Sequence, residues 1–251
     1  GQHVLKSIEL IMREVSNLKR IGEQYSAQDS GTLSIATTHT QARYVLPHAV
    51  AKLRSSYPKV RISLHQATPH EVARMVLDEQ AEIGMATESL ADYPDLVTLP
   101  CYEWEHVLVV PPSHPLATKE RIGLDDLAIE PLITYHPSFT GRTKIDAAFA
   151  VRQLHPRVVL EAIDSDVIKT YVRLGLGVGI VAEMAMREDP GVDLIARPLG
   201  HLFGQSVARV AFKRGAYLRN FVYKFAETLS DRLSRDLIIR AMQGEPGDYS
   251  L

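Results

Sequence analysis

A run of neutral hydrogen-bonding side chains is the most informative chemistry in the sequence. Thr37-Thr-His-Thr-Gln41 follows a short β-type stretch and precedes a helical pattern. Four of these side chains carry neutral donors, and the His39 ring offers a further one. Such donors, beside the free N–H groups of a helix start, suit an anion such as sulfate, which only accepts hydrogen bonds near neutral pH. The simpler interpretation, that the threonines merely cap the helix, stays open.

Polar residues also follow other expected strands. Thr87-Glu88 follows a strand at 82–86, Ser138–Arg142 follows one at 132–135, and Asp164-Ser-Asp166 follows one that ends near Ile163. Parallel α/β sheets bind ligands at the carboxyl ends of their strands, so these side chains converge if two sheets face one another. Arg142 would then neutralise an anion, or else lie on the surface.

Other chemistries lack the residues they need. The ten histidines are scattered, with no His-Glu-x-x-His pair, so we expect no metal site. No Gly-x-Ser-x-Gly elbow is present, and Cys101 has no neighbouring base, so we expect no catalytic residue. Gly175-Leu-Gly-Val-Gly179 follows a helix rather than a strand, so it predicts a helix end and a strand start, with no dinucleotide cofactor.

Composition narrows the class of protein. The chain has 251 residues, of which 45% are hydrophobic, enough for one large or two smaller domains. One cysteine excludes an internal disulfide, which fits a cytoplasmic location. No apolar run approaches a membrane span, and residues 1–30 are too charged for a signal peptide. A net charge of −2 and a first residue Gly1 indicate a fragment without its own DNA-contacting part.

The first 26 residues predict one helix. Val4, Ile8, Ile11, Val15 and Leu18 alternate by four and three residues, which is coiled-coil spacing. The helix therefore either pairs with another chain or packs on its own domain. A linker follows, up to residue 31.

Strand and helix patterns then alternate, which predicts parallel sheets with helices on both faces. Pro47 lies inside a helical stretch and predicts a short first turn near 40–44, then a kink or a restart of the helix. Thr68-Pro-His-Glu71 has the pattern of a capping box. The last dozen residues are expected to be a frayed tail. Expected strands are 32–36, 60–66, 82–86, 97–101, 106–111, 132–135, 157–163, 177–181 and 207–212, and later helices 140–152, 166–174 and 217–234.

Several of these segments resemble the LysR-type transcriptional regulators, and within them the CysB-like branch that governs sulfur assimilation. Thr-Thr-His-Thr-Gln in particular resembles that branch. The resemblance covers about residues 31–215 and weakens beyond 185. Its segments are Ile35–Tyr44, Ala86–Glu88, Leu99–Tyr102, Phe139–Arg142 and Asp166–Gly179.

The resemblance implies an α/β fold with two Rossmann-like lobes and a ligand cleft between them, as in type II periplasmic binding proteins. A linker and dimerisation helix (1–30) would precede lobe I (31–101 and 206–251) and lobe II (102–205). It also implies DNA binding through a winged helix-turn-helix domain missing from this chain, and dimers that become tetramers at full length.

The resemblance further implies an effector, either a small anion (sulfate or thiosulfate) or an acylated serine (N-acetylserine or O-acetylserine). It fits a general cysteine regulator or a paralogue for alkanesulfonate or sulfate-ester use. The alternative is the solute-binding protein of a transporter; an enzyme comes third. The implied effector-binding residues are Thr38, Thr40, Gln41, Thr87 and Thr140, with Tyr102 and Trp104 as weaker candidates.

Overall fold

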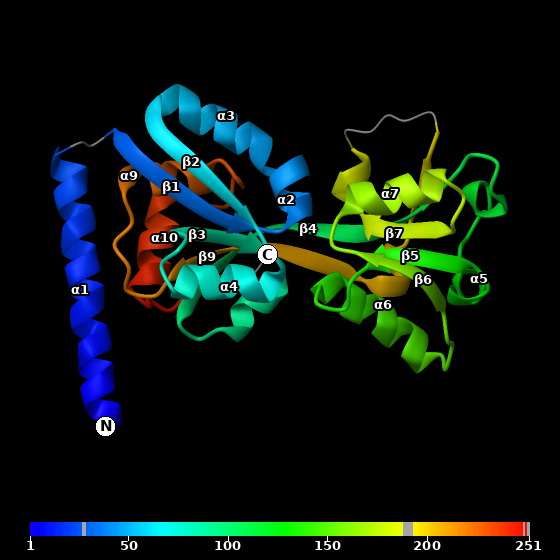
Figure 1. Ribbon diagram of the computed structural model, residues 1–251, viewed down its shortest axis with the longest axis horizontal. Coiled ribbons are helices and arrows are strands. Elements are labelled where there is room, and N and C mark those ends of the chain that lie inside the picture. The colour runs from blue at the N-terminus through cyan, green and yellow to red at the C-terminus, as the bar shows by residue number, and fades with distance from the viewer. Residues whose placement is uncertain (27–28, 188–192, 248, 250–251) are drawn as a thin grey trace.

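The computed structural model describes residues 1–26, 29–187, 193–247 and 249. Figure 1 shows two α/β halves side by side, with helices on both faces of each half. The mixed α/β fold, with a long helix before the sheet, confirms the predicted fold class. The strands are β1 (Ser30–Thr37), β2 (Lys59–Gln66), β3 (Ile83–Ala86), β4 (Leu96–Val110), β5 (Pro131–Tyr135), β6 (Arg157–Ala162), β7 (Val178–Ala182), β8 (Ile195–Pro198) and β9 (Gln205–Lys213).

The helices mostly follow the sequence pattern. Pro47 is the second residue of α3, so the backbone breaks after α2 as predicted. Thr68 forms the predicted capping box with Glu71. Gly175, at φ 77°, ends α7, and a Cβ at Gly179 would press on α7 side chains. The helices are α1 (Gln2–Ser26), α2 (His39–Tyr44), α3 (Leu46–Ser56), α4 (Pro69–Leu77), α5 (Leu124–Ala128), α6 (Thr140–Val151), α7 (Ser165–Arg173), α8 (Gly200–Phe203), α9 (Asn220–Glu227) and α10 (Arg235–Met242).

The sheets are mixed, so the expectation of purely parallel sheets is wrong. The strand order is β2-β1-β3-β9-β4-β7-β5-β6, with β8 also on β4. Pairs of β1 with β2 and β3, and of β5 with β6 and β7, are parallel. Every pair that includes β4 or β9 is antiparallel. β9 runs opposite to β3 of the first half, and β4 runs opposite to β7 and β8 of the second half.

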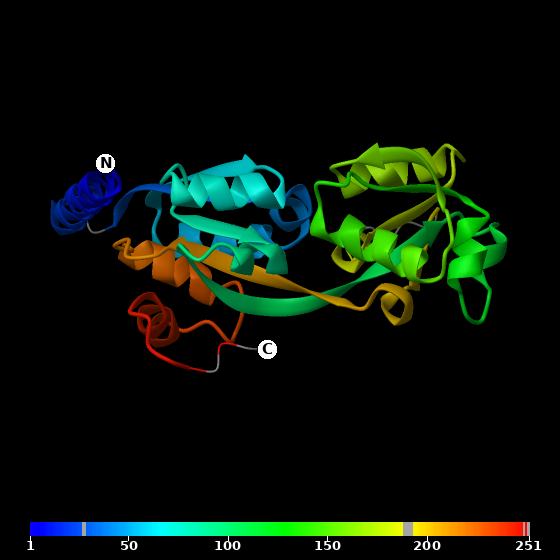
Figure 2. The same cartoon turned by 90° about the horizontal axis from the view of Figure 1, so that it is seen from below.

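One long strand replaces the two predicted at 97–101 and 106–111. β4 pairs with β9 from Leu96 to Glu105 and with β7 from His106 onward, so a single strand serves both halves. The strand carries a register shift between Pro100 and Tyr102, and residues 102–105, expected to separate two strands, pair regularly with β9. Figure 2 shows β4 and β9 running beneath both halves. The predicted lobe limits at 101/102 and 205/206 stay a prediction.

The expected helix at 217–234 is too long, because α9 covers only Asn220–Glu227 and α10 begins later, at Arg235. The Thr228 hydroxyl donates to the Phe225 carbonyl oxygen at 2.6 Å, which competes with helix continuation. Ser234 then caps α10 by accepting from the Leu237 N–H group at 3.1 Å. The predicted frayed tail is partly wrong as well, since α10 reaches Met242 and buries Ala241. Residues 248, 250 and 251 lie outside the described residues.

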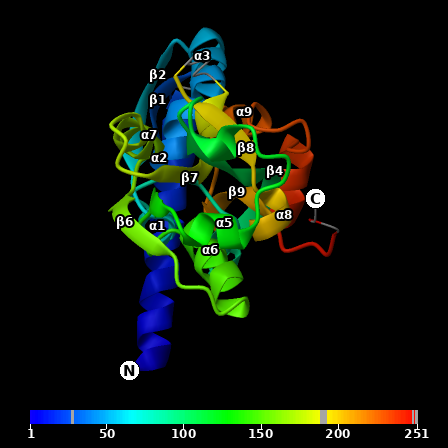
Figure 3. The same ribbon diagram turned by 90° about the vertical axis from the view of Figure 1, so that its right-hand side faces the viewer.

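Helix α1 projects away from the body of the molecule (Figure 3). The side chains of its apolar seam are 50–67% exposed, so the seam does not pack on its own domain. The helix is instead attached through polar contacts: Asn17 bonds the Gly215 carbonyl and the Tyr217 N–H group, and Arg20 bonds Glu79 at 2.7 Å. None of the helices in the described part of the chain has the length and apolarity of a membrane span.

Candidate functional site

A small cavity of about 30 Å³ lies between the two halves. The end of β1 and the start of α2 form one wall, and the start of α6 forms the opposite one. The rest of the cavity wall comes from β4 and from the carboxyl ends of β3, β5 and β7. The lining residues are Thr38, Thr40, Gln41, Thr87, Trp104, Tyr135, Phe139, Thr140, Gly141, Ala182 and Met184.

All five main effector-binding candidates line this one cavity, although they come from three distant segments of the chain. Trp104 lines it too. Tyr102 lies one layer behind and donates its hydroxyl hydrogen bond to Gln41 Oε1. Burial raises the pKa of the Tyr102 phenol, so it stays a donor at neutral pH. This bond sets the Gln41 amide with its NH2 group on the side away from Tyr102.

The threonines of α2 do not act as simple caps. Thr38 stands at the N-cap of α2, yet its side chain makes no capping hydrogen bond. The Thr40 hydroxyl instead contacts Ser165 Oγ of the other half at 3.1 Å. The capping interpretation of this motif is therefore wrong.

Hydroxyl groups bridge the two halves on both sides of the cavity. Thr87 and Thr140 share a hydrogen bond of 2.7 Å, and Thr140 also donates to Ser89 Oγ at 3.1 Å. Opposite them, Ser165 joins Thr40 to the Tyr135 hydroxyl, 2.6 Å away. Hydroxyls rotate freely between donor and acceptor roles, so these pairs can turn toward a third partner.

No charged side chain lines the cavity within the described residues. Arg142 was expected either to neutralise the anion or to lie on the surface, and it lies in neither place. It is buried, and its guanidinium bonds Asp146 at 2.8 Å, Glu161 at 2.7 Å and the Tyr135 carbonyl at 2.9 Å. His39 also faces away from the cavity and pairs with Asp164.

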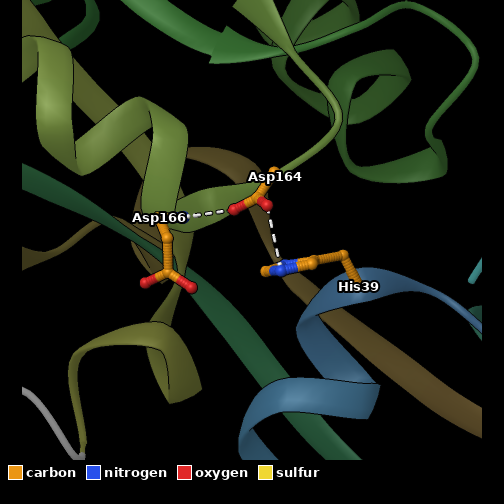
Figure 4. Close-up of side chains that lie close together, drawn as sticks. All are labelled: His39, Asp164 and Asp166. Carbon is orange, nitrogen blue, oxygen red and sulfur yellow. Dashed lines mark hydrogen bonds and ion pairs between the residues drawn. The ribbon is translucent and has the colours of Figure 1, made fainter.

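His39, Asp164 and Asp166 form a cluster with metal-ligand atoms within 4.8 Å of one another (Figure 4). These carboxylates already have partners. One carboxylate oxygen of Asp164 lies 2.9 Å from His39 Nε2. The other oxygen caps α7 by accepting hydrogen bonds from the N–H groups of Asp166 and Val167. We therefore assign the cluster to contact between the halves rather than to a metal.

The contact between α2 and α7 also contains a buried lysine, Lys169, which was not among the predicted site residues. Lys169 is 2% exposed and donates to the Tyr44 hydroxyl and the Ala185 carbonyl, both at 2.9 Å, with Asp166 at 3.1 Å. Tyr44 also donates to Asp166. Although burial raises it, the hydrogen bonds from Tyr44 and Lys169 hold the pKa of Asp166 below its usual range. The only local signal was the Asp166–Lys169 spacing of three residues on one helix face.

Comparison with known proteins establishes the class. The family sequence model described as the LysR substrate binding domain matches residues 26–234. The chain therefore belongs to the LysR family of transcriptional regulators. Within the described residues no winged helix-turn-helix is present.

Three relatives narrow the assignment within this family. The transcriptional regulator CysB of Burkholderia cenocepacia is 54% identical over 253 residues, covering 100% of this chain and 80% of that protein. The regulator SsuR of the same organism is 45% identical over 234 residues, covering 93% of this chain and 76% of SsuR. The crystal structure of the cofactor-binding domain of the Cbl regulator superposes with a TM-score of 0.80 at 45% identity, covering 85% of this chain and 94% of that chain.

These relatives confirm a CysB-like regulator of sulfur metabolism with an effector-binding domain. They are transcriptional regulators rather than enzymes, as the sequence predicted. The alternative of a transporter's solute-binding protein finds no support among them.

Proposed function

We propose that the chain is the effector-sensing domain of a regulator of sulfur assimilation and cysteine biosynthesis. It binds sulfate or thiosulfate, or an acylated serine such as N-acetylserine or O-acetylserine, in the cavity between the halves. The observation that supports this proposal is the convergence of Thr38, Thr40, Gln41, Thr87 and Thr140 on one uncharged cavity. Effector binding there controls DNA binding and transcription through a domain outside this chain.

A fully ionised anion fits this chemistry. Sulfate only accepts hydrogen bonds, and the cavity offers hydroxyl and amide donors with no carboxylate among its lining residues. A volume of about 30 Å³ holds roughly one water molecule, so any of these ligands must part the paired hydroxyls. The bonds lost between hydroxyls are replaced by bonds to a charged ligand, which contribute more, roughly 1.5–3 against 0.5–1.5 kcal/mol each.

Assembly is the second part of the proposal. The exposed seam of α1 pairs with the same seam of a second chain, because a row of apolar side chains 50–67% exposed needs a cover. Closed twofold dimers are the commonest assembly, and tetramers follow in the full-length, cytoplasmic protein. Deletion of residues 1–26 weakens self-association in sedimentation; an unchanged oligomeric state refutes the pairing.

Calorimetric titration tests the effector. The natural chain is titrated with sulfate, thiosulfate, N-acetylserine and O-acetylserine, with chloride as the reference anion. Thr140→Ala lowers the affinity for the bound ligand by about tenfold or more. Thr140→Ser lowers it much less, because serine keeps the hydroxyl. Thr143→Ala, an exposed position on the same helix, is the matched control. Binding of none of the four ligands, or equal affinities for the alanine and serine variants, refutes the proposal.

A further inference from the structure

His106 lies behind the cavity at the point where β4 passes from one half to the other. Glu105 still pairs with Gln205 of β9, whereas His106 pairs with Ala182 of β7. The His106 side chain is fully buried, and neither ring nitrogen has a hydrogen-bond partner within the described residues. Buried polar groups are nearly always hydrogen-bonded, so an unsatisfied imidazole at this place calls for an explanation.

The His106 ring is held between two other rings. Trp104 meets it edge to face with centroids 5.0 Å apart, and Phe203 does so on another side at 5.9 Å. These two aromatic contacts favour the observed orientation of the imidazole. Burial, with the nearby charge of Lys144 as a second cause, lowers the pKa of His106 to about 4, so the ring is neutral near pH 7 and adds no charge to the cavity.

The ring presses against the first turn of α6, which carries Thr140. A Cβ atom built on Gly141 would lie 2.7 Å from His106 Nε2 and 3.6 Å from Trp104 Cη2. Separations under 3.0 Å essentially do not occur for real Cβ atoms, so only glycine allows this approach. Gly141 and Trp104 both line the cavity, so His106 supports two of its walls from behind.

We propose that His106 is a positioning residue for the effector, and that its wedged ring sets how closely the first turn of α6 approaches β4. That spacing places the Thr140 hydroxyl within reach of Thr87 and limits the depth of the cavity beside Trp104. His106 thereby favours a small anion over a bulkier acylated serine. This inference rests on the proposed function.

A double-mutant cycle tests the contact. Gly141→Ala forces α6 away from His106 and weakens sulfate binding by about tenfold or more. His106→Ala in the same chain gives the new methyl group room, so Gly141→Ala costs less than about threefold in that background. Gly123→Ala is the matched control, because its Cβ would meet only Asp126 Oδ2 at 3.7 Å at the start of α5 in the same half. Purely additive effects overturn the proposal.

The ratio of the affinities for two ligands tests the positioning role, because a general loss of stability does not change that ratio. The natural chain, His106→Ala and His106→Asn are titrated with sulfate and with N-acetylserine. His106→Ala raises the N-acetylserine to sulfate affinity ratio by about tenfold, and His106→Asn, which keeps a planar polar group against Gly141, shifts it by less than about threefold. Equal ratios in the three chains overturn the positioning role, and this arm decides the matter if Gly141→Ala does not fold. Failure of the natural chain to bind either probe overturns the proposed function as well.

Discussion

The cavity and the neighbouring α2–α7 contact both join the two halves, yet they use different chemistry. The cavity side is closed by neutral hydroxyl pairs such as Thr87–Thr140. The α2–α7 side is closed by ion pairs and charge-assisted bonds around Asp164, Asp166 and Lys169. Hydrogen bonds between neutral groups contribute less than bonds to charged ones, so the first set exchanges readily for a ligand and the second does not. Charged groups hold the halves together at α2–α7, while neutral hydroxyls bridge them at the cavity.

The largest effect that separates the two regions is expected from Lys169→Met. The buried Lys169 ammonium donates to the Tyr44 hydroxyl and to the Ala185 carbonyl, so its removal takes away two charge-assisted hydrogen bonds and lowers the free energy of unfolding by about 3 kcal/mol. Effector affinity of the folded protein changes less than about threefold, because Lys169 does not line the cavity. Urea unfolding and calorimetric titration measure the two quantities, with Lys52→Met, at an exposed position of α3, as the control. A loss of affinity with unchanged stability contradicts the division between the regions.

Acidification is expected to act on the cavity side through His106. Its pKa is about 4 in the folded protein and about 6.5 when unfolded, so the unfolded chain binds more protons between these values. Its stabilising effect is fully present above pH 6.5 and is lost as the pH falls toward 4, by about 3 kcal/mol. Urea unfolding across pH 4–8 measures this loss, and His106→Asn removes that part of it. Identical pH profiles for the natural chain and the variant exclude His106 as the source.

A smaller effect, on affinity alone, is expected at Thr40. Its hydroxyl turns from Ser165 to the effector, so Thr40→Ala weakens binding by roughly ten- to a hundredfold, and Thr40→Ser costs much less. Calorimetric titration with melting curves alongside gives both readouts. Were Thr40 only a bridge to Ser165, the alanine variant would lose ~1 kcal/mol of stability and keep its affinity.

Cys101 belongs to neither region and is expected to show the smallest effect. It is a buried free cysteine on β4, and burial raises the pKa of its thiol to about 12. The thiolate is the reactive form, so a thiol reagent at pH 8 modifies the folded protein far more slowly than the chain in urea. Cys101→Ala leaves effector affinity unchanged. Rapid modification of the folded protein contradicts this assignment.

Local patterns in the sequence located much of the fold. Pro47 separates α2 from α3, and Thr68 with Glu71 starts α4, because a missing N–H group and a capping side chain act within a few residues. The same local information misplaced β4 and the region after α9. Whether a strand continues across two sheets depends on partners 70 or more residues away, and no local pattern encodes them.

The sequence by itself determined which groups are offered to a ligand, namely hydroxyls and amides that follow strand ends. It also carried the segments that resemble a family of regulators. Only the tertiary structure decided that Arg142 and His39 turn away into ion pairs, and that Tyr135, Ser165 and Gly141 join the site. The reason is physical. The type of a side chain is a property of its own position, whereas its partner is selected by the packing of segments brought together from the whole chain.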